Sequence, residues 1–210
     1  VDLINYDSKN KLWKVFTKRG SKNFEYLSQD VVYTPPPQSL LKNLDRNSIF
    51  FNKYIKNIEK LPEPSGALVF YSAISKDNLK SVMSNHYQIV DHDLGSLFIS
   101  FSENGDGRAP EGEITLIASV FANINDWQGI NRDLYLTKKD YFFQKISSVI
   151  EKRFEILPEN WLHRELATPI SFERWTNRPR GIVGGLGQNP DIFGIFGLSS
   201  RTPMRGLWLC

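Results

Sequence analysis

Cysteine is almost absent from this sequence, and long hydrophobic runs are missing altogether. The single cysteine among 210 residues has no partner for a disulfide within the chain. No apolar stretch reaches the ~18 residues that a membrane-spanning helix needs. The sequence therefore predicts neither an internal disulfide nor a transmembrane helix.

A large excess of positive or of negative charge is also missing. The 26 Lys and Arg residues nearly balance the 23 Asp and Glu residues, which gives a formal net charge of +3. Charges of both signs alternate along most of the chain, whereas nucleic-acid-binding proteins gather Lys and Arg into a patch or stripe. We therefore expect no nucleic-acid partner.

The side-chain combinations of hydrolytic or metal-dependent enzymes cannot be identified either. No Ser–His–Asp or Cys–His set and no pair of carboxylates stands out. His86 and His92, with Asp91 and Asp93, come nearest to a metal cluster, but their order matches no metal-site spacing. We interpret this segment as a polar loop and expect no metal.

Aromatic residues, in contrast, are plentiful. They make up 13% of the chain, and 14 of them are phenylalanine. With 40% hydrophobic and 23% charged residues, the composition is that of an ordinary globular protein. The aromatic side chains fit a large hydrophobic core, and they also fit a pocket for an extended apolar ligand.

The N-terminal segment has the pattern of a small β-meander. We expect strands over Val1–Tyr6, Lys11–Thr17 and Phe24–Tyr33, separated by short polar turns. Three consecutive prolines, 35–37, end the last strand because proline supplies no donor to a β-ladder.

Two helices are expected next. The first spans Gln38–Asp45, and the second begins at a cap on Asn47 or Ser48 and ends near Lys60. The second helix combines an apolar stripe with a basic face. This fits either a helix packed on the core or a helix lying on an anionic membrane surface. The stripe consists of Phe50, Phe51, Tyr54, Ile55, Ile58 and Leu61.

The nearly continuous apolar run Ala67–Ile74 predicts a central strand buried on both faces. Alternation along this strand places Phe70 and Ser72 on one face and Val69 and Tyr71 on the other.

Two more strands are expected on either side of a polar loop. Ser96–Ser102 alternates cleanly, and Glu113–Ala122 follows the Gly- and Pro-containing segment 103–112. We expect these strands to form a long antiparallel pair. A single helical turn is expected over Asn78–Met83.

A long helix is expected from Thr137 to about Ile156, because Thr137 and Asp140 have the spacing of a capping box. Its buried stripe is predicted to be Phe142, Ile146, Val149, Ile150 and Phe154.

Three further elements complete the expected fold. Pro158 suits a helix start, so a short helix is predicted over Glu159–Leu166. A last strand is expected over Phe172–Thr176 or Arg180–Gly184. The sequence thus predicts an α+β fold: an antiparallel or mixed sheet with helices 38–60 and 137–166 covering one face, plus the N-terminal meander.

Glycine is concentrated at one place. Gly181, Gly184, Gly185 and Gly187 lie within seven residues, but their spacing is not the G-x-G-x-x-G of dinucleotide-binding folds. A proline at position 190 also stands where that motif would start a helix. We interpret the cluster as a Gly-rich turn.

The last quarter of the chain resembles a known family. Thr168–Arg178 reads T-P-I-S-F-E-R-W-T-N-R, residues 181–185 read G-I-V-G-G, and Arg201–Cys210 reads R-T-P-M-R-G-L-W-L-C. This order is similar to the C-terminal region of the FAD-dependent phytoene desaturase, carotenoid isomerase and retinol saturase group. That group belongs to the wider amine-oxidase-like flavoproteins. The resemblance is weaker upstream.

The resemblance implies that the chain is a part of a larger protein. In that group the apolar strand is followed by Gly-Asp or Gly-Ala and a Pro-Gly-x-Gly turn that contacts the flavin. Neither this turn nor an N-terminal G-x-G-x-x-G lies within these residues. We expect segments 1–36 and 203–210 to belong to a flavin domain, and segment 37–202 to be a substrate-binding domain.

The resemblance implies FAD as the cofactor, with contacts from Gly184, Gly185, Arg201, Thr202 and Pro203. From the residues alone, Arg201 could hold a cofactor phosphate or merely stabilise a turn.

Substrate contacts are implied for Phe70 and Ser72, because the family's matching strand belongs to the sheet that floors the substrate cavity. They are also implied for Arg174 and Trp175. From the residues alone, Arg174 could orient a substrate or anchor a loop. The resemblance further places the strand at Asp30–Thr34 near the flavin.

Three functions remain open from the sequence. The first is the substrate-binding portion of an FAD-dependent oxidoreductase or isomerase that acts on carotenoid-like polyenes, with the isolated chain inactive. The second is a non-catalytic module that binds an apolar ligand or a membrane surface. The third is part of an amine-oxidase-type flavoenzyme, which an aromatic pair beside the flavin would favour. The expected location is cytoplasmic or peripheral to a membrane.

Overall fold

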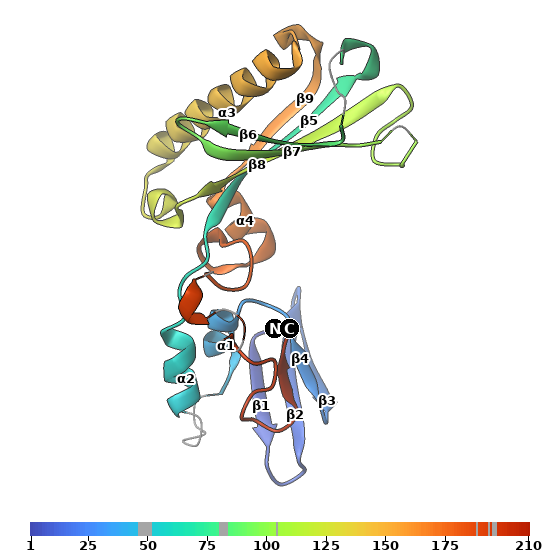
Figure 1. The fold of residues 1–210 in the computed structure, drawn as a ribbon. Coiled ribbons are helices and arrows are strands. Elements are labelled where there is room, and N and C mark those ends of the chain that lie inside the picture. The colour runs from blue at the N-terminus through green and yellow to red at the C-terminus, as the bar shows by residue number, and fades with distance from the viewer. Residues whose placement is uncertain (46–51, 80–83, 104, 188, 193, 195–196) are drawn as a thin grey trace. The chain divides into compact units, whose positions relative to one another are not determined.

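The computed structural model describes residues 1–45, 52–79, 84–103, 105–187, 189–192, 194 and 197–210 (Figure 1). The chain forms two compact units. Unit 1 comprises Val1–Pro64 with Gly184–Cys210, and unit 2 comprises Ser65–Val183. The predicted segment boundaries were instead after residues 36 and 202. The assignment of segments to a flavin domain and a substrate-binding domain stays a prediction.

The predicted meander is confirmed in unit 1. Strands β1 (Leu3–Asp7), β2 (Leu12–Arg19) and β3 (Lys22–Ser28) form an antiparallel sheet in that order. The predicted strand Phe24–Tyr33 is wrong in one respect, because it divides into β3 and a separate strand, β4 (Val31–Tyr33). The Ser28 hydroxyl donates to the Asp30 carbonyl oxygen at 2.6 Å. Such local side-chain bonds compete with ladder pairing.

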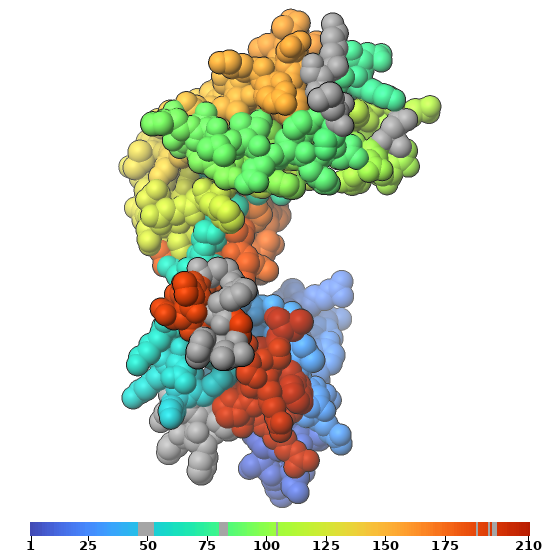
Figure 2. Space-filling view, viewed as in Figure 1, coloured from blue at the N-terminus to red at the C-terminus, as the bar shows by residue number. Residues whose placement is uncertain are grey.

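Strand β4 pairs in parallel with β10 (Leu207–Leu209), so the beginning and the end of the chain meet in one small sheet. In the space-filling view, the C-terminal segment (red) lies against the N-terminal strands (blue) (Figure 2). Gly206, just before β10, has a φ of +77°, and a Cβ there would collide with the Gln29 carbonyl oxygen. Only glycine fits this close approach.

Helices α1 (Pro37–Asn43) and α2 (Asn52–Glu59) belong to unit 1. The expectation that they cover the larger sheet is therefore wrong. Their apolar residues instead join the core of unit 1, because the small meander and the β4–β10 pair expose apolar faces of their own. This core consists of Ile4, Trp13, Tyr33, Leu40, Leu44, Ile58, Met204, Leu207 and Leu209.

The predicted cap on Asn47 or Ser48 lies outside the described residues, as do Phe50 and Phe51. Of the remaining stripe, Ile55 and Ile58 are buried. Among the described residues, no helix is both long and apolar enough to cross a membrane.

Unit 2 is built on an antiparallel sheet with the strand order β6-β7-β8-β5-β9. The strands are β5 (Gly66–Ser75), β6 (His86–Asp91), β7 (Gly95–Phe101), β8 (Glu113–Ala122) and β9 (Trp161–Ala167). The long helix α3 (Arg132–Phe154) lies along one face of this sheet (Figure 1). The α+β prediction is thus confirmed, as is the antiparallel pairing of β7 with β8.

Only one face of β5 is fully buried, which corrects the prediction of burial on both faces. Leu68 and Phe70 are buried beneath α3, whereas Tyr71 is 38% exposed on the opposite face. The sheet has one covered and one open face, as antiparallel sheets commonly do.

The predicted polar loop at residues 86–93 is wrong over residues 86–91. His86–Asp91 forms the edge strand β6, whose Tyr87 and Ile89 pack against the core. This alternation of exposed and partly buried residues is a strand pattern. The predicted helical turn at Asn78–Met83 lies partly outside the described residues; a 3₁₀ turn covers Lys76–Asn78.

Helix α3 begins earlier than predicted. Asn131 is its N-cap, with a side chain that accepts from the Leu134 N–H at 2.9 Å, and Thr137 lies inside the helix. Asn is at least as good a cap as Thr. The predicted stripe is confirmed, since Ile146, Ile150 and Phe154 are buried and Phe142 and Val149 pack against them.

Two predicted elements exchange their type. The expected helix Glu159–Leu166 is a 3₁₀ turn, Pro158–Asn160, followed by β9, which pairs with the edge of β5. The expected strand at Phe172–Thr176 is helix α4 (Pro169–Thr176). Thr168 caps α4 in a capping box with Ser171, and Pro169 stands at its first position. The alternative strand, Arg180–Gly184, is also absent: a 3₁₀ turn spans Pro179–Gly181.

Candidate functional site

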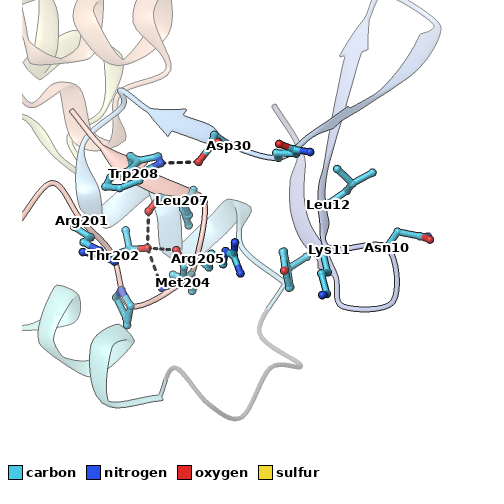
Figure 3. Close-up of a pocket in the computed structure, with 14 residues that line it drawn as sticks. Asn10, Lys11, Leu12, Asp30, Arg201, Thr202, Met204, Arg205, Leu207 and Trp208 are labelled. Carbon is cyan, nitrogen blue, oxygen red and sulfur yellow. Dashed lines mark hydrogen bonds between the residues drawn. The ribbon is translucent and has the colours of Figure 1, made fainter.

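Unit 1 contains a pocket of about 870 Å³ between the β1–β2 hairpin and the loop that precedes β10 (Figure 3). Three segments that are far apart in the sequence form its walls. Its lining residues are Tyr6, Asn10, Lys11, Leu12, Gln29, Asp30, Arg201, Thr202, Pro203, Met204, Arg205, Gly206, Leu207 and Trp208. Arg201, Thr202 and Pro203 from the predicted cofactor set are therefore brought together at this pocket.

The loop wall of the pocket is held firmly. The buried Thr202 hydroxyl lies 2.7 Å from the Leu207 carbonyl oxygen and accepts from the Met204 N–H at 3.1 Å. The Leu209 N–H donates to the Ser200 carbonyl oxygen at 2.7 Å, and Arg201 forms an antiparallel bridge with Trp208. The Thr202 hydroxyl thus forms its hydrogen bonds within the loop itself.

Two tryptophans tie the loop to the N-terminal strands. Trp13 Nε1 donates to the Arg205 carbonyl oxygen at 3.0 Å, and Trp208 Nε1 donates to Asp30 Oδ1 at 3.0 Å. The Trp13 ring is fully buried in the unit 1 core. These bonds fix the loop wall relative to the strand wall.

Asp7 organises the hairpin turn that carries Lys11. Asp7 Oδ2 accepts from Asn10 Nδ2 at 2.9 Å and pairs with Lys14 Nζ at 3.0 Å. The hydrogen bond from Asn10 is the largest cause that lowers the pKa of Asp7 below its ordinary range, followed by Lys14. Lys11 itself has a φ of +56°, a left-handed conformation that is uncommon for a residue with a side chain.

The pocket carries more positive than negative charge. Lys11, Arg201 and Arg205 all line it, and within the described part of the chain their side chains make no ion pair or hydrogen bond. Asp30 is the acidic residue of the lining, and it accepts from Trp208. Lys11 and Arg205 were not predicted as site residues, because only the fold brings the hairpin turn to the loop.

The second candidate surface is the open face of the sheet in unit 2. Tyr71, Phe98 and Ile117 lie on neighbouring strands on the face opposite α3, with 38%, 47% and 41% of each residue exposed. Val69 and Phe121 extend the same face. Polar residues, among them Ser100 and Ser119, lie between these side chains on the same face. Exposed apolar side chains gathered on one face are candidates for a binding surface.

The predicted substrate residues Phe70 and Ser72 lie on the covered face. Phe70 is fully buried and contacts the rings of Phe143 and Trp161 at 5.5 and 6.0 Å between centroids. The Ser72 hydroxyl donates to the Leu116 carbonyl oxygen at 3.1 Å. Both side chains are thus buried in the interior of unit 2. A substrate role for them stays a prediction.

Arg174 and Trp175 lie together at the exposed end of α4. The Arg174 guanidinium is 5.3 Å from the centroid of the Trp175 ring, and Trp175 is 78% exposed. They belong to unit 2, whereas the pocket belongs to unit 1. Their role in substrate binding also stays a prediction.

The glycine cluster divides into packed and open positions. A Cβ on Gly181 would collide with the backbone of Pro169, so this glycine permits the close approach of its loop to α4. Gly184 and Gly185 have no atom within 4 Å of such a Cβ, and neither lines the pocket. Their predicted contact with a cofactor stays a prediction. Among the described residues, no group of His, Cys, Asp and Glu is suited to hold a metal ion.

No family model matches the chain. By sequence it is 29% identical to the chloroplastic prolycopene isomerase of Daucus carota and 26% identical to that of Arabidopsis thaliana, each over 130 residues. These alignments cover 60% of this chain and 21% and 22% of the two relatives. Prolycopene isomerase 2 of an Oncidium hybrid is 24% identical over 158 residues, which cover 74% of this chain and 27% of the relative.

One solved structure, an oxidoreductase from Methanosarcina mazei, aligns with 93% of this chain and 42% of its own. The TM-score is 0.46 at 12% identity, which is too low to support an argument. By sequence, the chain is therefore similar to a region of plant prolycopene isomerases, and it spans between about a fifth and a quarter of the length of those relatives.

Proposed function

We propose that this chain is the substrate-binding region of an FAD-dependent oxidoreductase or isomerase that acts on carotenoid-like polyenes. The similarity to prolycopene isomerases carries the proposal. The motifs at Thr168–Arg178 and Arg201–Cys210 agree with it, since they resemble the phytoene desaturase, carotenoid isomerase and retinol saturase group.

The open face of the unit 2 sheet is the surface that fits such a substrate. Ile117 lies opposite Tyr71, whereas Phe98 lies opposite Ser119, one row along the sheet. Adjacent strands are about 4.8 Å apart, so a ligand that crosses β7, β8 and β5 obliquely would contact Phe98, Ile117 and Tyr71. A rod-shaped, apolar polyene matches this band in shape and in polarity. Ligand sites bury most of their ligand, so the face would be one wall of the complete site.

The residues of this chain do not fit a complete flavin site. The sequence contains no G-x-G-x-x-G. The Thr202 hydroxyl forms its hydrogen bonds within its own loop and not towards a ligand. In the group that the chain resembles, the turn that contacts the flavin follows the apolar strand, whereas Arg201, Thr202 and Pro203 precede β10. A bound flavin would supply the redox chemistry. We assign to this chain the binding of the substrate alone.

The test is polyene binding by the 210-residue chain and by two variants of the open face, Phe98→Ser and Ile117→Ser. We expect β-carotene in detergent to bind and to show a shifted absorption spectrum, and each variant to weaken binding about tenfold, because burial of such a side chain contributes ~1.5–3 kcal/mol.

Leu136→Ser is the matched control, because Leu136 is an exposed apolar residue on α3. Equal binding by all three variants would contradict the assignment of the open face. A complete enzyme that contains this region and that turns over polar amines but no polyene would refute the substrate class.

A further inference from the structure

We propose that the pocket of unit 1 binds a phosphate-bearing ligand, at a site separate from that of the flavin. The inference rests on the proposed function only in placing the flavin elsewhere.

The pocket lies at the amino ends of the parallel pair β4–β10. Its loop residues Arg201–Gly206 precede β10, and Gln29 and Asp30 precede β4. In the group that the chain resembles, the turn that contacts the flavin follows the apolar strand, which places the flavin beyond the carboxyl end of β10. The ligand of this pocket is therefore a second molecule.

The charge of the pocket indicates an anion with two negative charges. Lys11, Arg201 and Arg205 contribute three positive charges, and Asp30 contributes one negative charge. The three cations have no ion-pair partner among the described residues, although the pocket gathers them from opposite walls (Figure 3). Arginine and lysine bind phosphate through strong, charge-assisted hydrogen bonds, which fits a phosphate group better than a neutral ligand.

Both walls are built in advance of binding. The Trp13 and Thr202 hydrogen bonds hold the loop that carries Arg205 and Arg201. Asp7 holds the turn that carries Lys11. Lys11, Arg201 and Arg205 are exposed. A rigid site loses little conformational entropy when the ligand binds, so even exposed charges can give useful affinity.

Lys11 supplies an independent indication. It stands at a φ of +56°, where Gly or Asn would fit with less strain. Residues held in sparsely populated conformations cluster at functional sites. A lysine at this strained position is explained if its ammonium group binds the ligand.

Phosphate could come from a free metabolite or from the head group of a lipid. Titration calorimetry with inorganic pyrophosphate tests the first source, and flotation with phosphatidylcholine vesicles, with and without phosphatidate, tests the second. Binding in either arm supports the site and identifies the source. Binding in neither arm overturns it.

Three variants of the 210-residue chain locate the site: Lys11→Gly, Arg201→Ala and Arg205→Ala. We expect each to lower the affinity about tenfold, the usual effect of losing one charge-assisted hydrogen bond. Lys9→Gly is the matched control, because Lys9 lies in the same hairpin turn but does not line the pocket.

Lys11→Gly also separates binding from folding. Glycine accepts the left-handed conformation without strain, so the melting temperature should hold or rise while binding falls. Equal affinity in Lys11→Gly and Lys9→Gly would overturn the site. The same variants should bind β-carotene like the unchanged chain, so failure of either proposal can be recognised without the other.

Discussion

At the scale of single residues, the close approach at Gly206 makes the clearest prediction. We expect Gly206→Ala to lower the free energy of unfolding by about 2 kcal/mol or more, because the substitution adds both a strained φ and a collision with Gln29. Urea unfolding monitored by tryptophan fluorescence would measure this.

Gly20→Ala is the control for the conformation alone. Gly20 also has a positive φ, +61°, but a Cβ there would meet open space. Gly20→Ala should lower the free energy of unfolding by about 1 kcal/mol. Equal losses at both positions would show that the collision with Gln29 does not matter.

Tyr33 links stability to alkaline pH. Burial raises its pKa from 10.0 to about 12, and its hydroxyl donates to Asn43 Oδ1 at 2.8 Å. Between these pH values the unfolded chain releases the phenolic proton and the folded chain retains it. The contribution of Tyr33 is therefore complete below pH 10.0 and is lost as the pH rises towards about 12.

We expect Tyr33→Phe to reduce this alkaline loss of stability, measured as the urea midpoint between pH 9 and about 12. Burial also raises the pKa of Tyr54, so part of the slope should remain. Tyr26→Phe is the control, because Tyr26 is exposed on the meander. If the urea midpoint of Tyr33→Phe fell with pH as steeply as that of the unchanged chain, Tyr33 would not be the cause of the alkaline loss of stability.

Sequence reasoning identified individual residues where a motif contains them. Arg201, Thr202 and Pro203 were selected by resemblance as cofactor contacts. They line a pocket, and their contact with FAD stays a prediction. Lys11 and Arg205 were missed, because the contact that joins their segments, Trp13 to Arg205, spans most of the chain. A local sequence pattern cannot predict a contact between residues so far apart in the sequence.

At the scale of elements, Glu151 connects helix α3 to the edge strand β9. Its Oε1 accepts from Trp161 Nε1 at 2.8 Å and from Arg164 at 3.2 Å. We expect Glu151→Ala to lower the free energy of unfolding by about 2 kcal/mol, because two donors lose their acceptor. Thermal unfolding followed by circular dichroism would report it.

Glu151→Gln keeps an acceptor for Trp161 and should cost about half as much. Glu159→Ala removes an exposed carboxylate in the adjoining turn and should cost little. If Glu159→Ala were as damaging as Glu151→Ala, the connection between α3 and β9 would not be the cause.

Elements were predictable where periodicity and burial agree. β8 occupies the predicted residues, and β7 differs by one residue at each end, because alternation there coincides with a buried and an open face. β9 was mistaken for a helix because Pro158 is a good helix start, yet the free edge of β5 accepts a strand. Tertiary pairing outweighed the local signal.

At the scale of the whole molecule, the two units differ in how the sequence builds them. Unit 2 is one continuous segment that contains its own sheet and helix, whereas unit 1 needs both ends of the chain. We expect residues 65–183 alone to fold, with a cooperative thermal transition and the circular dichroism of a mixed α and β protein.

Residues 1–64 alone should fail to fold, because they lack Met204, Leu207 and Leu209 from their core. Mixing them with a peptide of residues 184–210 should restore structure. A cooperative transition in 1–64 alone, or none in 65–183, would contradict this division.

The parallel pairing of β4 with β10 can form only late in synthesis. On a ribosome, β4 emerges early, and the whole of unit 2 is made before its partner strand appears. At ~5–20 residues per second, this delay is on the order of ten seconds. During that interval the nascent strand presents an unpaired edge and the Trp13 ring lacks its cover. Yield in cells should therefore depend on chaperones that shield the first segment until the last is translated.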